Sequence, residues 1–138
     1  MENRNASGPF DVHLEPQPLG FGLEGSGVAR MSLAKRFHGD LEATSHGEML
    51  AVRDTMLNSG GYVALEAVHG TLHGRSGGFV LQHSSTMTRS VPVQSITVVP
   101  DSGTGELAGI EGRMVVDIAA DGAHSYRFEY SVPKVGTR

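Results

Sequence analysis

The sequence predicts an all-β fold, an eight-stranded antiparallel β-barrel formed by a single domain. Three observations lead to this prediction. Apolar and polar side chains alternate along much of the 138-residue chain, and this period of two is typical of half-buried strands. Nineteen glycines and six prolines divide the chain into short segments. The dividing segments are rich in turn-forming residues and short enough for antiparallel hairpins.

Eight segments have the character of strands. The last is the clearest, because aromatic side chains occupy every second position at Tyr126, Phe128 and Tyr130. The first nine residues are predicted to be a mobile segment, which leaves 10–138 as the barrel domain. In chain order the predicted strands are 10–15, 28–37, 41–50, 62–69, 79–88, 93–99, 113–119 and 125–132.

The segment 48–57 fits the alternating pattern less well. Met49, Val52 and Met56 lie at helical spacing, so a short helix and a long bent strand are both open there. We favour a strand that continues to about Val52 and is followed by an irregular connection.

Eight antiparallel strands can form a barrel or a two-sheet sandwich. A barrel removes both exposed sheet edges, and glycines inside strands, such as Gly47 and Gly70, permit the tight coiling that closure requires. An eight-stranded barrel has an interior wide enough for packed side chains or for one small ligand. We therefore favour the barrel.

The composition excludes several classes of function. No cysteine is present, which excludes disulfides, thiolate metal sites and cysteine nucleophiles. Eleven Lys and Arg against fifteen Asp and Glu give a formal net charge of −4, which argues against a nucleic-acid partner. No apolar run resembles a secretory signal or approaches the roughly 20 residues of a membrane helix. We expect a cytoplasmic protein without a membrane partner.

Three motifs suggest a catalytic or binding site, but the residues around them do not fit that chemistry. Residues 74–78 match the G-x-S-x-G nucleophile elbow, but a strand-like segment follows where the elbow needs a helix. The glycine-rich segment 103–109 lacks the spacing and the Lys-Ser/Thr pair of a phosphate loop. His69 and His73 would lie ~13 Å apart on a strand, too far to share an ion. We predict turns at both glycine-rich segments and no metal or other cofactor.

The informative polar groups lie within apolar strands. Glu66 shares a face with Tyr62, Ala64 and Val68, and this face either meets solvent or places Glu66 in a pocket as its polar group. If Glu66 serves a function in the interior, we expect Glu66→Gln to impair binding or turnover while stability is maintained or rises, because a buried charge is removed. Gln82 and His83 point to opposite faces, so only one of them can face inward with Glu66.

Lys35 and Glu42 complete the set of charged candidates. Lys35 is either a surface side chain or a charge partner for Glu42 or Glu66, and Glu42 belongs to a polar face for which a solvated wall is the default. Glu66 and His83 are the candidate catalytic residues. The candidate substrate-binding residues are Tyr62, Gln82, Lys35, Phe37, Glu42, Tyr126 and Tyr130.

Four runs carry a resemblance to a known family: RMSLAKRFHGDLEATS at 30–45, GYVALE at 61–66, GGFVLQH at 77–83 and VVPDSGTGEL at 98–107. They resemble DUF3224, a bacterial family of unknown function. The C-terminal part, with its glycine-rich turn at 103–109 and its aromatic stripe, also looks like plant allene oxide cyclase. That second resemblance implies a calycin-like barrel with an apolar lumen in which a flexible molecule is held for ring closure. It transfers no catalytic residue, and Glu66 is only an analogous carboxylate.

Two functions follow as expectations. In the first, an allene oxide cyclase-like barrel holds a small, apolar or amphipathic molecule and catalyses a cofactor-independent cyclisation or isomerisation in bacterial secondary metabolism. The alternative is a non-catalytic barrel that binds or carries such a molecule. A barrel with a filled core and a structural role is a third interpretation. Apolar residues on both faces of 62–68 and 114–119 predict a homo-oligomer.

Overall fold

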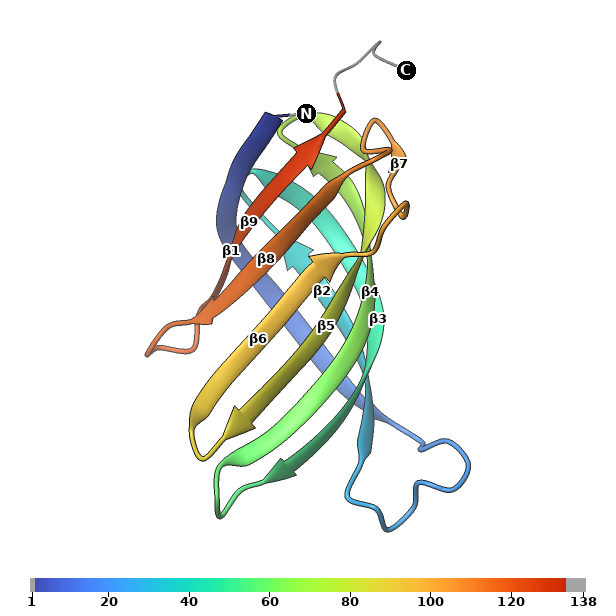
Figure 1. Cartoon of the computed structure of the whole chain (residues 1–138), viewed down its shortest axis with the longest axis vertical. Helices are drawn as coiled ribbons and strands as arrows, with labels where there is room; N and C mark the ends of the chain where they lie inside the picture. The colour runs from blue at the N-terminus through green and yellow to red at the C-terminus, as the bar shows by residue number, and fades with distance from the viewer. Residues whose placement is uncertain (1, 134–138) are drawn as a thin grey trace.

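The computed structural model describes residues 2–133, and within that range the alternating segments form nine strands and no helix (Figure 1). No helix long and apolar enough to cross a membrane occurs among these residues. The strands are β1 (Glu2–Gln17), β2 (Ala29–Phe37), β3 (Leu41–Asp54), β4 (Ser59–Leu72), β5 (Arg75–Thr88), β6 (Val91–Val98), β7 (Thr104–Gly105), β8 (Glu111–Ile118) and β9 (His124–Val132).

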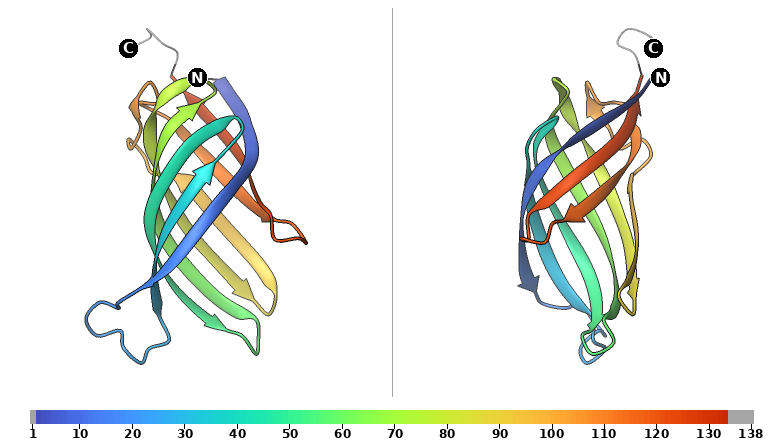
Figure 2. Two further views of the ribbon diagram at one scale, coloured as in Figure 1. Left: turned by 180° about the vertical axis from the view of Figure 1, so that it is seen from behind. Right: turned by 90° about the vertical axis from the view of Figure 1, so that its left-hand side faces the viewer.

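Eight of the strands close into a barrel, which confirms the predicted fold class. Their order is β4-β3-β2-β1-β9-β8-β6-β5, and pairing between β4 and β5 completes the circle. Every pairing is antiparallel, and the two-residue strand β7 adds to β5 near one end. Figure 2 shows the strongly tilted strands from two further sides. Side chains at alternate positions therefore point into one enclosed interior.

Most strands extend further than the sequence predicts, and the extensions of β1 and β3 change the prediction most. β1 begins at Glu2, and residues 2–9, predicted to be a mobile segment, pair with β9 from Glu2↔Val132 to Pro9↔Ser125. Their polar sequence shows little apolar alternation, so their pairing with β9 was not visible locally. β3 continues to Asp54, and the turn after it occupies residues 55–58, so 48–57 contains no helix.

One end of the interior is packed with apolar side chains. Tyr126, Phe128 and Tyr130 are at most 3% exposed, as the aromatic stripe predicts, and Phe128 stacks on Phe79 with 5.5 Å between ring centroids. The segment between β7 and β8 adds Leu107 to this core. We call this the closed end.

The other end of the interior is open to solvent. On β4 the inward-facing residues change from buried Val68, Glu66 and Ala64 to half-buried Tyr62. On β5 they change from buried Leu81 and His83 to half-buried positions at 85 and 87. We call this the open end. Its half-buried inward-facing residues are Met31, Met49, Ala51, Tyr62, Ser85 and Met87.

Two glycines allow β3 and β4 to approach closely. A Cβ at Gly47 would lie 2.2 Å from the Leu65 carbonyl oxygen, and one at Gly70 would lie 2.3 Å from that of Glu42. Both distances are far below van der Waals contact, so neither position accommodates a side chain without movement of the backbone. The predicted role of these glycines in tight coiling agrees with this geometry.

Candidate functional site

The site is centred on Glu66, which points into the barrel from the middle of β4. Its side chain is 0% exposed, and its neighbours on the inner face are Ala64 and Val68. In the register it lies between Gly47 of β3 and Leu81 of β5. Of the two alternatives for this face, the structure has the buried one. A carboxylate at such a position requires partners, because its desolvation is costly.

Three side chains supply those partners, each from a different strand. Lys35 Nζ of β2 donates to Glu66 Oε1 over 3.1 Å, and His83 Nε2 of β5 lies 2.8 Å from the same oxygen. Ser45 Oγ of β3 donates to Glu66 Oε2 over 2.5 Å. Four adjacent strands therefore meet at one carboxylate. We call Lys35, Ser45, Glu66 and His83 the buried polar cluster.

The partners determine the charge of Glu66. Burial alone would raise its pKa, but the hydrogen bond from His83, the positive charge of Lys35 and the hydrogen bond from Ser45 together outweigh burial and lower the pKa. Glu66 is consequently an ionised carboxylate at neutral pH. Both of its oxygens are engaged, so its role is to hold its partners rather than to accept a proton from a bound molecule.

Lys35 is enclosed rather than on the surface. Its side chain is 8% exposed, and its ammonium group lies 5.0 Å from the ring centroid of Phe10 and 5.7 Å from that of Phe37. Aromatic faces attract a cation and compensate for part of its lost hydration. Of the two charge partners that the sequence offered for Lys35, the structure selects Glu66 and not Glu42.

His83 links the cluster to the open end. A carboxylate only accepts hydrogen bonds, so the Nε2 atom facing Glu66 carries a proton. In the neutral imidazole the Nδ1 atom is then an acceptor, and it lies 3.4 Å from the hydroxyl of Tyr62. Tyr62 is half-buried, and its ring centroid is 6.0 Å from that of His83. Glu66, His83 and Tyr62 thus form a chain from the buried interior towards solvent.

The remaining candidates lie elsewhere. Gln82 and Glu42 point outward and are exposed, so neither lines the barrel interior, and their predicted role in binding a substrate stays a prediction. Phe37 is wholly buried beside Lys35. Tyr126 accepts a hydrogen bond from the Leu41 amide and donates to the His38 carbonyl, and Tyr130 is hydrogen-bonded to His73. These two tyrosines belong to the closed end and are not part of the cluster.

Sequence reasoning missed two contributors. Ser45 is buried on the inner face of β3, between Ala43 and Gly47, whereas the polar residues that the sequence made conspicuous belong to the outer face. Phe10 contacts Lys35 from β1. The only signal for Ser45 in the sequence is one hydroxyl among small residues that face inward. Alternation alone does not distinguish such a serine from a small residue that only fills space in the core.

The two glycine-rich segments are turns only in part, which corrects the prediction of a turn at each. The turn before β5 is confined to His73 and Gly74, so residues 75–78 of the G-x-S-x-G match already belong to β5, and this strand, not a helix, continues after them. The segment 103–109 contains the short strand β7 and a turn. Glu106 of that turn accepts a hydrogen bond from the Ser76 amide. Across residues 2–133, no group of three or more His, Cys, Asp or Glu side chains is arranged to hold a metal ion.

The comparisons with known proteins agree with the fold. A family model described as "Protein of unknown function (DUF3224)" matches residues 6–130. A crystal structure of a DUF3224 protein of unknown function from Shewanella oneidensis MR-1 has 43% sequence identity and a TM-score of 0.87, covering 96% of this chain and 100% of that one. No curated protein matches the chain. These comparisons do not show the resemblance to allene oxide cyclase, which stays a prediction.

Proposed function

The chain belongs to the DUF3224 family, whose function is unknown, and we propose that it binds a small, largely apolar molecule at the open end of the barrel and moves a proton on it. The reaction class is a cofactor-independent isomerisation or cyclisation. His83 is the proton-transfer group in this proposal, and Glu66 is its positioning residue. Cytoplasmic location and a place in bacterial secondary metabolism stay predictions.

The observation that carries the proposal is the position of the buried polar cluster. It forms the last buried layer of the interior before the inner face becomes accessible at Tyr62. A carboxylate with no exposure, a lysine and a histidine cost stability compared with apolar side chains of similar volume. Glu66, whose pKa is lowered by its partners against the effect of burial, lies next to the accessible part of the inner face, and groups with a shifted pKa at such positions are candidates for acid–base sites.

A second observation is an unpartnered hydroxyl beside this layer. Ser85 lies directly opposite Tyr62 in the β4–β5 register. Its Oγ atom is buried and has no hydrogen-bond partner among the described residues. Buried polar atoms are almost always paired, so this hydroxyl is a suitable anchor for a polar group of a bound molecule. The flexible side chains of Met31, Met49 and Met87 supply apolar walls around it.

The proposed chemistry follows from the hydrogen-bond directions. His83 Nδ1 removes a proton from an acidic C–H group, such as one beside a carbonyl, once the bound molecule displaces the long contact with Tyr62. The imidazolium formed is stabilised by ionised Glu66, to which Nε2 already donates. Lys35 keeps Glu66 ionised through the step. A proton then returns from Nδ1 to another atom of the molecule, so the reaction is balanced without a cofactor, and exchange of the Nδ1 proton with solvent in the meantime introduces deuterium in D₂O.

The test is proton exchange in D₂O. A panel of small apolar ketones, β-ketoesters and α,β-unsaturated carbonyl compounds is incubated with protein, and deuterium incorporation is followed by mass spectrometry. We expect exchange with the natural chain and its loss in His83→Asn. Thr44→Ala changes an outward-facing residue and should leave exchange intact. Equal exchange in His83→Asn would show that His83 does not move the proton.

A carrier function is the second candidate, and the three methionines at the open end favour it, because flexible thioether side chains suit varied apolar ligands. Binding is measured by NMR titration of the side-chain methyl groups with the same panel. Binding without deuterium exchange supports the carrier. A panel in which no compound shifts these methyl groups contradicts both functions.

A further inference from the structure

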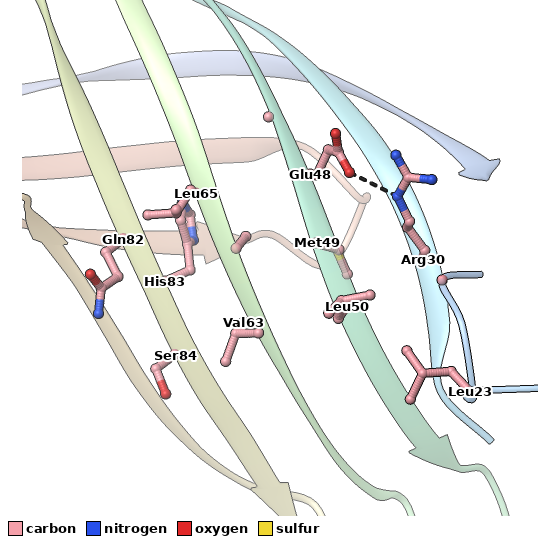
Figure 3. Close-up of a pocket in the computed structure, with 13 residues that line it drawn as sticks. Leu23, Arg30, Glu48, Met49, Leu50, Val63, Leu65, Gln82, His83 and Ser84 are labelled. Atoms are coloured by element: carbon pink, nitrogen blue, oxygen red, sulfur yellow. Dashed lines mark hydrogen bonds and ion pairs between the residues drawn. The ribbon is translucent and has the colours of Figure 1, made fainter. Parts of the chain in front are cut away.

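A shallow groove crosses the outside of the barrel, over β2, β3, β4 and β5 (Figure 3). Its volume is about 840 Å³, and a second depression of about 370 Å³ continues it along the same strands. Leu23, from the loop between β1 and β2, borders both. The side chains of the buried polar cluster point into the barrel, away from the groove, although the backbone at His83 forms part of the groove's floor, and the inference below does not rest on the proposed function.

The outer surface in this groove is unusually apolar. Leu50, Val63 and Leu65 point outward and are 39%, 52% and 56% exposed. Outer positions on the other strands are mostly polar, for example Arg127 and Glu129 on β9, and the exposed apolar ones there, such as Val93 on β6 and Val115 on β8, do not line the groove. An outer sheet face that meets only water carries polar side chains, and a contiguous exposed apolar area marks a binding surface. The groove is therefore a surface that lacks its partner in the isolated chain.

The shape of the groove favours a macromolecular partner over a small ligand. Consecutive residues of each strand line it, at 47–50 on β3, 63–65 on β4 and 82–84 on β5. Since neighbouring side chains of a strand point to opposite faces, such a lining means that the sheet itself is the floor. Small-molecule sites enclose 70–90% of their ligand, and a groove floored by an open sheet does not.

The same surface presents a projecting aromatic side chain. Phe21, in the loop that supplies Leu23, is 106% exposed, so it contacts nothing within its own chain. A fully exposed phenylalanine and an apolar groove beside it are together the two halves of a self-complementary contact. In a two-fold dimer each copy offers the same patch, and the projection of one meets the depression of the other.

Charge is compatible with self-association at this face. The protein carries a net charge of −4, so two copies repel each other overall. Within the groove, however, Glu48 is paired with Arg30 over 2.8 Å. The groove lining therefore brings no unbalanced carboxylate against its symmetry mate, and residues 18–28 add one exposed carboxylate, Glu24.

We propose that this groove is the contact face of a homodimer in which Phe21 of each copy enters the groove of the other. Residues 18–28 and the outer faces of β3 and β4 then form one interface. The predicted homo-oligomer thus acquires a location, and the other apolar outer positions, such as Val115 on β8, lie outside it.

Sedimentation velocity from about 1 to 100 µM tests the location. We expect a species of twice the 14.6 kDa chain mass, with a dissociation constant raised more than about tenfold by Leu65→Arg and by Phe21→Ser. Val115→Arg is the matched control, because Val115 is also apolar, outward-facing and 40% exposed. Thermal unfolding checks that each variant is folded. A monomer at every concentration, or a dimer weakened only by Val115→Arg, overturns the proposal.

Disulfide trapping tests the geometry, and the absence of natural cysteine makes it specific. Phe21→Cys and Leu65→Cys are prepared as separate proteins with different tags, mixed and oxidised. We expect the mixed disulfide to exceed both self-disulfides. The proposal is overturned if the yield of mixed disulfide is no higher than the yield obtained when Phe21→Cys is mixed with Val115→Cys. A monomer whose Leu50, Val63 and Leu65 methyl signals shift with the apolar panel compounds would instead assign the groove to a small ligand.

Discussion

The Lys35–Glu66 ion pair allows a quantitative test of how the barrel tolerates charge in its interior. Replacing Glu66 by Gln keeps its size but leaves the ammonium group of Lys35, only 8% exposed, without its counter-charge. Replacing Lys35 by Met leaves the buried carboxylate with only His83 and Ser45. The K35M/E66Q double variant removes both charges together and retains the volume of the pair.

The expected energies differ sharply between single and double variants. Removing one partner of a buried pair costs about 3–5 kcal/mol, because the other charge stays buried. Replacing both by neutral side chains leaves stability within about 1 kcal/mol of the natural chain or raises it. The destabilisations of the two single variants should therefore sum to more than that of the double variant, by more than about 2 kcal/mol. The sequence-based expectation is that E66Q is at least as stable as the natural chain, and the pairing of Glu66 with an enclosed Lys35 reverses that sign.

Urea unfolding followed by far-ultraviolet circular dichroism measures these differences. Glu48→Gln is the matched control, because Glu48 pairs with Arg30 at the surface and its loss should leave the midpoint unchanged. If a single variant is unfolded without urea, a folded double variant still confirms the coupling. This coupling is refuted if E66Q and K35M each lower the free energy of unfolding by less than about 0.5 kcal/mol. It is also refuted if the two losses simply add in the double variant.

Three further outcomes are expected. The partners of Glu66 lower its pKa, so the stability that this carboxylate provides is present above its unfolded-state pKa of about 4.5 and is lost as the pH falls through the lower folded-state pKa. In an acid titration followed by circular dichroism, the natural chain should therefore lose stability more steeply below pH 4.5 than K35M/E66Q does. Tyr126→Phe leaves the buried Leu41 amide without its acceptor and should cost about 1–3 kcal/mol in urea unfolding, with no change in deuterium exchange on the carbonyl panel. The Gln94 side chain accepts a hydrogen bond from the Val116 amide and donates one to the Val116 carbonyl, at a place where the β6 and β8 backbones share a single paired position. Gln94→Ala should therefore increase amide hydrogen exchange along β6 and β8, and unchanged protection would show that Gln94 does not hold these strands together.

Local sequence patterns predicted the strands and the faces within each strand. Alternation placed Glu66 on one face with Ala64 and Val68, and the aromatic stripe of Tyr126 and Phe128 on one face of the last strand; both arrangements are present. Such patterns work because successive side chains of a strand point to opposite sides. They failed for residues 2–9, where strand pairing with β9 holds a segment that has little apolar alternation of its own.

The choice between Gln82 and His83 required the register of the β4–β5 hairpin. That register is set by the two-residue connection His73-Gly74, in which both residues have positive φ. The left-handed conformation at both positions is that of a type I′ turn, which Asn-Gly signals far more clearly than His-Gly. With this turn, His83 lies opposite Ala64 and points inward beside Glu66, while Gln82 points to solvent. A shift of one residue would have exchanged them.

The sequence by itself determined that this protein consists of antiparallel strands and favoured a barrel over a sandwich, and it showed that the protein uses no cysteine chemistry and that a carboxylate interrupts an apolar strand. Only the tertiary structure decided what that carboxylate does. Lys35 lies 31 residues from Glu66, on β2, and β3 separates the two strands in the sheet. Their side chains meet because the closed, coiled sheet brings inward-facing groups of several strands together in one interior, whereas a period along a single strand carries no information about neighbours across it.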